Sequence, residues 1–484
     1  MAMVRLMTDL RLNFNRIYVA TDYMNRIYIH IIHIGLAMLL LAGCKSDYPH
    51  IEYNGNPGTV EFDNIDARVP IMVAINDPLY QNYTRGVGAF DNVMDENGIN
   101  ENWKNADIFV YAFYTPDGMA NTPSNTNYSE RMDSKDANKI YCLVDDADND
   151  NIGHGKKARL NRDMTSFLQW TDNDMVYYNG TYPQYRYRFF AYHIDDAADM
   201  SKKPERKSDY VSYDVQIDGT QDLMCSYAQP TAEQLARMEN LASPGNKNFV
   251  NNLSKLIYST ETGHRDLFPI FKMDHQLAYV RFFLKADSIT DASGNKMMDP
   301  EIAMVRVENI VINERYHGEF IVAAEETGRL GVNFTNEKRN YYMPVKVKTD
   351  AYGDVVTDAE GHRITVSRDE EGVVMAGDSD GFNPRLIPSA KECEVGMGIL
   401  LPPADKYSLK LLCKQLKTDE DGNQEEIPYQ HDQAYELMLP NGKSFEAGRK
   451  YEVVIKVYGL RNIVLQLGDV QWKDGGSIDI DEDQ

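Results

Sequence analysis

The chain contains few cysteines for its length, and they lack the spacings that cysteine chemistry requires. Its 484 residues include five, Cys44, Cys142, Cys225, Cys393 and Cys413, and no two of them form a C-x-x-C pair. Neither a zinc site nor a dense disulfide framework is therefore indicated. We expect the four cysteines after Cys44 to be buried as small apolar side chains, and a Cys393–Cys413 disulfide is the alternative.

Positive charge is scarce as well. The chain has 50 Lys and Arg residues against 74 Asp and Glu residues, which gives a formal net charge of −24. A surface of this kind repels the phosphates of nucleic acid. We therefore predict no nucleic-acid partner and favour an extracellular or surface-exposed protein.

Motifs of the common enzyme classes are missing. No serine lies in a G-x-S-x-G motif, and none of the ten histidines lies in an H-E-x-x-H motif. Gly86-x-Gly88 is followed by Asp91 where a dinucleotide-binding loop has its third glycine, and there is no P-loop. We predict a non-enzymatic protein without a cofactor, and a surface hydrolase is a hypothesis that no motif supports.

A long apolar run is also absent. The apolar stretch at residues 27–42 is short for a bilayer span and is interrupted by His30, His33 and Gly35. A transmembrane helix is therefore the poorer interpretation of this stretch.

What the stretch does have is a distinctive end. Residues 40–44 read Leu-Leu-Ala-Gly-Cys, and polar chain follows at once, which is the pattern of a bacterial lipoprotein signal. We predict a signal peptide over 1–43, cleavage between Gly43 and Cys44, and a lipid on Cys44 that holds the mature chain in the outer membrane at the cell surface. Met24, with the basic residue Arg26 two positions later, makes a better start of translation than Met1.

Beyond this signal the dominant pattern is alternation of apolar and polar residues with a period of two, which predicts strands. Turn signals such as Asn441-Gly442 separate these segments. Short strands with few helical patterns are typical of β-sandwiches, so we predict an all-β fold. The predicted strands are 69–75, 107–114, 186–192, 211–217, 277–285, 304–313, 318–323, 407–413 and 450–458.

One segment predicts a helix. The predicted helix spans residues 231–241 and begins at Thr231, whose side chain can cap the first turn. This helix lies in the polar stretch 229–262, which we interpret as a linker. The predicted organisation is an N-terminal β-sandwich domain over 44–262, linker included, and a C-terminal β-sandwich domain over 263–484.

An acidic loop offers the only candidates for a metal ion. Asp146, Asp148 and Asp150 alternate as carboxylates do in calcium-binding loops. An EF-hand loop would need glycine and glutamate where Asn151 and Lys157 stand. A solvated acidic loop is the plainer interpretation.

Histidine and tyrosine receive structural interpretations. His275 stands at the head of an apolar strand, where we expect a packed or hydrogen-bonded histidine rather than a catalytic one. We expect the 31 tyrosines mainly to fill sandwich cores and strand faces, with platforms for stacking sugars as the alternative.

Four stretches together resemble a known family. The combination is similar to the Bacteroidota fimbrillins and their Mfa-like relatives, the lipoprotein-derived subunits of type V pili. The stretches are residues 187–192 (YRFFAY), 217–224 (IDGTQDLM), 271–278 (FKMDHQLA) and 445–451 (FEAGRKY), the last followed by 458–460 and Trp472.

The resemblance implies two transthyretin-like β-sandwich domains and a structural or adhesive role in a surface fimbria. Members of the family are exported as lipidated precursors. In their stalk subunits an arginine-specific protease removes the N-terminal piece with the first strand, and a strand of the next subunit fills the groove. Expected partners are therefore other fimbrial subunits and host or glycan ligands.

The resemblance makes two arginines candidate maturation sites. Arg85 lies in a polar, glycine-containing loop, and cutting there would release everything from Cys44 onward, including the strand 69–75. Cutting at Arg68 would leave that strand in place. An ordinary surface arginine is the other interpretation of Arg85.

A donor strand could come from the C-terminus. Ile463, Leu465 and Leu467 alternate there, and Ile478 and Ile480 alternate again near the end. These residues could equally complete the chain's own second sandwich. The position in the fimbria, whether stalk, tip or anchor, stays open, and the competing hypothesis is a surface lipoprotein that binds glycans and never polymerises.

Overall fold

The computed structural model describes most of the chain beyond residue 185 and short parts before it. All of these residues lie in the compact unit Phe62–Gln484. The described ranges are 69–75, 106–115, 153–160, 167–171, 176–178, 186–240, 258–263, 267–290, 293–298, 300–368, 370–418, 424–429, 434–459 and 462–470.

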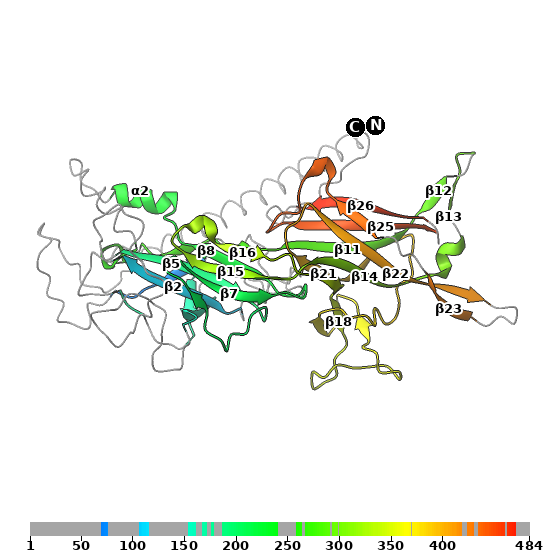
Figure 1. Ribbon diagram of the computed structural model, residues 1–484, viewed down its shortest axis with the longest axis horizontal. Helices are drawn as coiled ribbons and strands as arrows, with labels where there is room; N and C mark the ends of the chain where they lie inside the picture. Colours follow the sequence, from blue (N-terminus) through cyan, green and yellow to red (C-terminus); the bar gives the residue numbers. More distant parts are fainter. Residues whose placement is uncertain are drawn as a thin grey trace, which may run out of the picture. The chain divides into compact units, whose positions relative to one another are not determined.

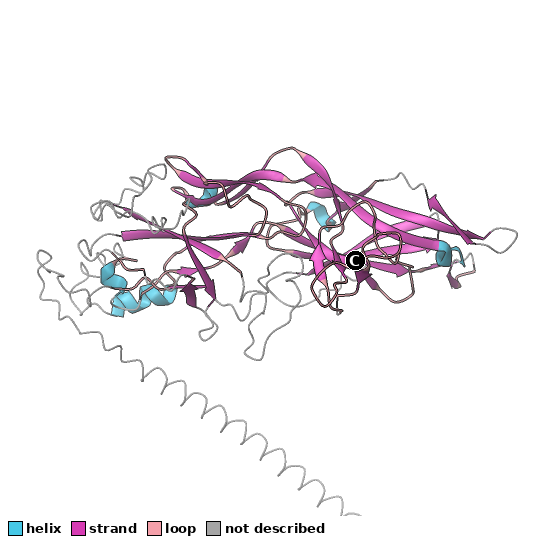
Figure 2. Cartoon of the chain, turned by 90° about the horizontal axis from the view of Figure 1, so that it is seen from below, coloured by secondary structure: helices cyan, strands magenta, loops and turns pink. Residues whose placement is uncertain are grey.

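The predicted all-β fold is confirmed, and strands dominate the described chain (Figure 2). A strand forms within each of the nine predicted ranges. The predicted helix is α2 (Ala232–Asn240). Thr231 caps it reciprocally, because Thr231 Oγ1 accepts from the Gln234 N–H at 3.1 Å and Gln234 Oε1 accepts from the Thr231 N–H at 3.1 Å.

The first sheet has eight strands in the order β10-β8-β5-β2-β3-β4-β1-β9. Its strands β2, β5 and β8 appear in blue and green in Figure 1. Their bounds are β1 (Val73–Ile75), β2 (Ile108–Thr115), β3 (Lys156–Leu160), β4 (Phe167–Trp170), β5 (Arg186–Ile194), β8 (Leu223–Tyr227), β9 (Ile270–Phe271) and β10 (Asp274–His275).

Both faces of this sheet are buried at its centre. On β2, Ile108 and Val110 belong to one core cluster. Phe109 and Tyr111 belong to another. Because successive side chains of a strand point to opposite faces, the sheet separates two apolar cores.

The two ends of the sheet approach each other. β9 and β10 stand at opposite ends of the strand order, yet only Lys272 and Met273 separate them in sequence. Two residues of chain span only about 10 Å from one strand to the next. The sheet therefore curves around the core cluster that contains Ile108 and Val110.

A second sheet has the order β16-β15-β7-β6 and contributes to the other core cluster. Phe320 on β15 and Tyr213 on β7 lie there with Phe109 and Tyr111 of the first sheet. The bounds are β6 (Glu205–Arg206), β7 (Tyr210–Gln216), β15 (His317–Ala324) and β16 (Gly331–Phe334), with a 3-10 turn at Thr327–Arg329.

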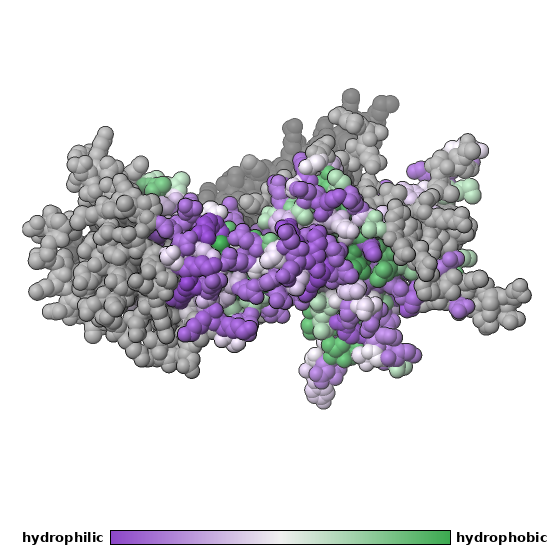
Figure 3. Space-filling view, in the orientation of Figure 1, coloured by the Kyte–Doolittle hydropathy of each residue, from purple (hydrophilic) through white to green (hydrophobic). Residues whose placement is uncertain are grey.

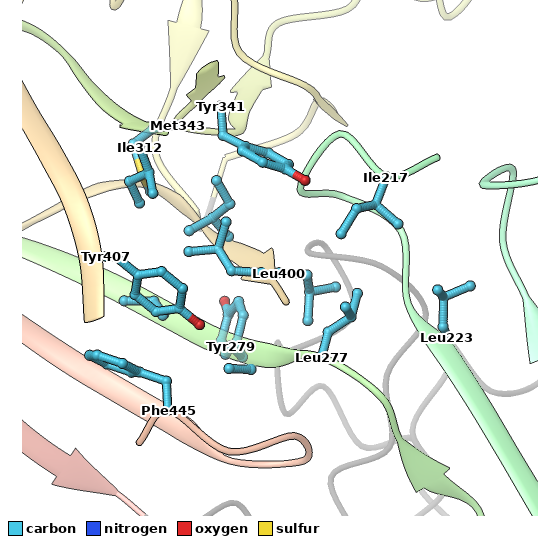
Figure 4. Close-up of a cluster of buried hydrophobic side chains, with 14 of the residues drawn as sticks. Ile217, Leu223, Leu277, Tyr279, Ile312, Tyr341, Met343, Leu400, Tyr407 and Phe445 are labelled. Carbon is cyan, nitrogen blue, oxygen red and sulfur yellow. The ribbon is translucent and has the colours of Figure 1, made fainter. Parts of the chain in front are cut away.

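Two further sheets form the C-terminal part. One has the order β17-β14-β22-β23, with β24 also on β22, and the other has the order β21-β11-β25-β26. Figure 4 shows Tyr279, Tyr407 and Phe445 of this part in one cluster with Ile217 and Leu223. The bounds are β11 (Ala278–Ala286), β14 (Val305–Arg315), β17 (Lys338–Tyr342), β21 (Cys393–Leu401), β22 (Lys406–Thr418), β23 (Gln424–Tyr429), β24 (Tyr435–Met438), β25 (Lys450–Gly459) and β26 (Asn462–Val470).

One long ribbon belongs to both parts. β14 continues through Tyr316 into β15, and the returning strands β16 and β17 pair with residues 318–321 and 311–315, on either side of Tyr316. The Tyr316 N–H donates to Glu337 O at 3.3 Å, and the Thr335 N–H donates to His317 O at 2.8 Å, so pairing is unbroken at the crossing. The first half of the ribbon pairs with β22 and the second half with β7.

The predicted domain division at 262/263 stays a prediction, but strand pairing crosses it. β9, β10 and β15 all follow residue 263, and they pair with β1, β8 and β7 from before it. The transthyretin-like detail likewise stays a prediction.

The smaller elements are insertions. β12 (Ser288–Thr290) and β13 (Lys296–Met298) form a hairpin, and a 3-10 turn follows at Pro300–Met304. In the acidic segment near 350–380, β18 (Val345–Val347) pairs with β19 (Thr365–Val366) and β20 (Val373–Met375). Short helical turns lie at Thr260–Gly263 (α4) and Pro440–Gly442.

The alternative of a Cys393–Cys413 disulfide is wrong. Both residues are free thiols, Cys393 exposed and Cys413 buried. Cys225 is also free and buried, so Cys225 and Cys413 are the small apolar side chains expected, and burial raises the pKa of both thiols. For Cys393 the expectation of burial is wrong, because this side chain is exposed. Cys142 lies outside the described residues.

We predict that truncating one side chain of the ribbon weakens both parts together. Phe320 is 0% exposed in the shared core cluster, so Phe320→Ala should lower the free energy of unfolding by about 3–5 kcal/mol. Urea unfolding should still show one transition. Tyr352→Ala is the control, because Tyr352 is 92% exposed and its loss should cost less than about 0.5 kcal/mol. Two separate transitions, only one of them shifted, would contradict the shared core.

Candidate functional site

The candidate site is the place that β1 occupies in the first sheet, between β4 and β9. We call β4, β9 and the segments beside them the cradle of β1. β1 lies between two segments that are far away in sequence. Val73 and Ala74 pair antiparallel with Leu168 and Phe167 of β4. On the other side β1 pairs parallel with β9. The strand is therefore inserted between neighbours that it does not adjoin along the chain.

Backbone and side-chain hydrogen bonds fix the strand from residue 69 onward. Each joins it to β4, β9 or the segments beside them, so withdrawing the strand would break the whole set. The bonds are Ile71 N–H to Val176 O (2.7 Å), Tyr178 N–H to Val69 O (2.9 Å), Ala74 N–H to Pro269 O (2.9 Å) and Trp170 Nε1–H to Ile71 O (3.2 Å).

The strand contributes a row of apolar side chains to the inner core. Val69, Ile71, Val73 and Ile75 are each at most 5% exposed, whereas Met72 between them is 41% exposed. Burying one such aliphatic side chain stabilises by about 1.5–3 kcal/mol, so the four contribute about 6–12 kcal/mol. That is comparable with the whole stability of a typical domain, about 5–15 kcal/mol. The first sheet therefore needs an occupant in this cradle.

The walls of the cradle are closely packed and buried. A Cβ atom on Gly263 would lie 2.6 Å from Val69 Cγ1 and 3.0 Å from Tyr178 Cε2, so only glycine fits there without displacement. Tyr178 is 3% exposed, and its hydroxyl has no hydrogen-bond partner among the described groups. Burial, with Tyr187 and Tyr258 nearby, raises the pKa of Tyr178 well above its ordinary value.

Most residues that the sequence singles out lie outside the described ranges. Cleavage, lipidation and calcium binding therefore stay predictions. The residues concerned are Gly43, Cys44, Arg68, Arg85, Asp146, Asp148 and Asp150. Within the described ranges, no three His, Cys, Asp or Glu side chains come together as a metal site.

The C-terminal alternation is part of the chain's own sheet as far as residue 470. β26 pairs antiparallel with β25, and Ile463, Leu465 and Leu467 lie opposite Val457, Ile455 and Val453. The second of the two interpretations therefore holds for these three residues. Ile478 and Ile480 lie outside the described residues.

His275 is a packed histidine, as expected from the sequence. It is 7% exposed, and its Nδ1 lies 2.7 Å from Oδ2 of Asp222, which is 0% exposed. His193 and Asp195 lie beside this pair. No spacing in the sequence singles these four residues out, because they lie in or beside three different strands, β5, β8 and β10.

Within the described ranges, the tyrosines mainly fill cores, as expected. Six of these described tyrosines are fully buried, namely Tyr111, Tyr192, Tyr279, Tyr341, Tyr407 and Tyr451. Tyr352 and Tyr177 are exposed. The face drawn in Figure 3 is mainly hydrophilic in its described part, with apolar residues gathered in small groups. Among the helices that the structure describes, none has the length and apolar character of a membrane span.

No protein-family model matches the sequence, and no curated protein matches it. Solved structures do match. One is a candidate cell adhesion protein from Bacteroides uniformis, with 11% identity and a TM-score of 0.37 over 84% of this chain and 99% of the other. Another from Bacteroides eggerthii has 9% identity and a TM-score of 0.30 over 83% and 96%. The fimbrial anchor protein Mfa2 from Porphyromonas gingivalis has 11% identity and a TM-score of 0.25 over 83% and 98%.

Identities and TM-scores of this size do not transfer an activity to this chain. The functional argument therefore rests on the cradle itself.

We predict that Gly263→Ala loosens β1. The added methyl group must displace Val69 or Tyr178, which should cost about 1–3 kcal/mol. Amide hydrogen exchange should speed up at Ile71 and Ala74, whose N–H groups are bonded in the cradle.

The matched control is Gly328→Ala. No atom lies within 4 Å of a Cβ there, so exchange at Ile71 and Ala74 should not change. Equal exchange rates in both variants would show that Gly263 does not hold the strand.

Proposed function

We propose that this protein is a structural and adhesive subunit of a surface fimbria that assembles by strand exchange, and that it has no catalytic role. The observation that supports this proposal is the insertion of β1 between β4 and β9, which lie far from it in sequence. A strand held in this way can leave without unthreading the rest of the fold.

An emptied cradle would attract a strand strongly. It would expose the apolar walls around Leu168, Trp170 and Phe271, together with the backbone groups that β1 now satisfies. Each buried polar group left unpaired costs about 1–3 kcal/mol. A strand supplied by another copy of the chain restores both contributions at once, which is donor-strand complementation.

The cradle also specifies the donor. Its apolar residues must occupy alternate positions that match Val69, Ile71, Val73 and Ile75. Ala74 points to the other face and is still only 3% exposed, so a small residue is required there. The donor must run antiparallel to β4 and parallel to β9.

The proposal assigns roles to residues outside the described part. Cys44 carries the lipid of the exported precursor and holds it at the outer membrane. Cutting after Arg85 then frees the piece that contains β1, whereas cutting after Arg68 leaves β1 covalently attached.

We predict that Arg85→Ala blocks polymerisation and leaves the monomer folded. Without the cut, β1 stays attached and keeps the cradle filled. Polymer ladders on unheated gels of surface protein should disappear, while circular dichroism and the melting temperature stay unchanged.

Arg68→Ala is the matched control and should polymerise normally. Unchanged ladders in Arg85→Ala would remove the role given to this residue. A chain that never polymerises, keeps β1 and is retarded on polysaccharide affinity gels would favour the glycan-binding lipoprotein instead.

A further inference from the structure

His193 lies in a buried site where both ring nitrogens face acceptors. It is 2% exposed. Its Nδ1 is 2.8 Å from the Asp107 carbonyl oxygen, and its Nε2 is 3.1 Å from Asp195 Oδ1. A carbonyl and a carboxylate cannot donate, so the ring must donate on both sides. Only the imidazolium carries both protons.

His154 differs from His193 because neither of its ring nitrogens faces a carboxylate. Its Nε2 lies 2.8 Å from the Met200 carbonyl oxygen, and its Nδ1 lies 2.6 Å from the hydroxyl of Tyr213. That hydroxyl also lies 2.6 Å from the hydroxyl of Tyr192. Burial lowers the pKa of His154.

The groups around His193 stand in a row across the first sheet. Ile194 of β5 pairs with Leu223, and His275 of β10 pairs with Met224. Asp107 immediately precedes β2, and its carbonyl oxygen is bound by His193. The row therefore joins the same end of four neighbouring strands, at the end where β10 leads into β11.

When His193 carries no proton, most of the titratable groups around it are carboxyl groups. Asp195 accepts from His193 and, at 2.9 Å, from the Asp222 backbone N–H. Asp222 is fully buried beside His275. The Asp107 carboxylate is engaged elsewhere, since it accepts from Lys157 at 3.0 Å and from Arg159 at 2.6 Å.

We propose that His193, in its protonated form, links β2 to β5 and stabilises the end of the first sheet where the chain passes into β11, so that this end of the sheet responds to pH. With the proton bound, the ring bridges Asp107 and Asp195. When the proton leaves, one of these two contacts is lost, and the partly buried Asp195 and the fully buried Asp222 carboxyl groups lose the cation that faces them.

The pKa directions agree with this geometry. Burial opposes the charge on His193, but the hydrogen bond and ion pair with Asp195 outweigh it and raise its pKa above 6.5. Its contribution to stability is therefore complete below pH 6.5 and is lost as the pH rises through the raised pKa. Burial also raises the pKa of Asp222 against the effects of His275 and His193, so ionisation of Asp222 acts in the same direction.

His154 has the opposite effect on the pH profile. Because its pKa is lowered in the folded chain, its titration reduces stability as the pH falls through the ordinary value of 6.5. It therefore cannot produce a loss of stability as the pH rises.

The experiment is urea unfolding of the full-length protein between pH 6 and 9, for the wild type and for His193→Gln. The glutamine can keep one of the two contacts but carries no charge at any pH. The wild-type unfolding constant should rise with pH, by up to about tenfold per pH unit where one proton is released. His193→Gln should unfold more easily at pH 6 and give a shallower profile, in which the contributions of Asp222 and His317 remain. Parallel profiles would overturn the proposal.

His317→Gln is the matched control. The pKa of His317 is also raised, by its hydrogen bond to Asp214, but this pair lies at the surface. The variant should keep most of the wild-type slope. A profile flattened by His317→Gln alone would assign the titration to the surface and overturn the proposal.

A second measurement decides the matter even where His193→Gln does not fold. Nitrogen NMR of the wild-type protein with ring-labelled histidine reports each ring as charged or neutral. One buried ring should titrate above pH 6.5, and in Asp195→Asn its pKa should fall. The absence of any buried ring that titrates above pH 6.5 would refute the proposal.

Discussion

The ribbon formed by β14–β15 and β16–β17 is the constraint on which the rest of the structure depends. It runs without a break in pairing from a C-terminal sheet into the sheet that packs beside the first. Its inward side chains, such as Ile312 and Phe320, belong to one core cluster. Because packed cores transmit strain, neither part can shift without disturbing the other. The ribbon is therefore a rigid support for the sheet that contains the cradle of β1.

Around this support the first sheet curves until β9 and β10 lie within two residues of each other. One consequence is that a short segment, 270–275, carries two duties. Through β9 it forms a wall of the β1 cradle, and through His275 it joins the buried row that contains His193 and Asp222. One short segment therefore connects β1 with the row that contains His193, although they lie at opposite ends of the strand order.

The sequence predicts much of this fold but few of its partnerships. A period of two identifies the strand 69–75 and the other long strands, because apolar side chains must face a core. The same period does not specify which strands pair, so the crossing at 262/263 and the neighbours of β1 are not predictable from it. β9 and β10 are too short for any period. His193 stands in an aromatic strand, and only the acceptors that the fold places beside it, the Asp107 carbonyl oxygen and the Asp195 carboxylate, distinguish it.

The central claim is that β1 leaves its own chain during assembly. Mass spectrometry of the N-terminus, on protein released from the cell surface, tests it most directly. The account predicts a chain that begins at Gly86, because cutting after Arg85 removes the strand with the lipidated piece. A surface protein that still begins at lipidated Cys44 retains β1 in its cradle and would contradict strand exchange in this subunit.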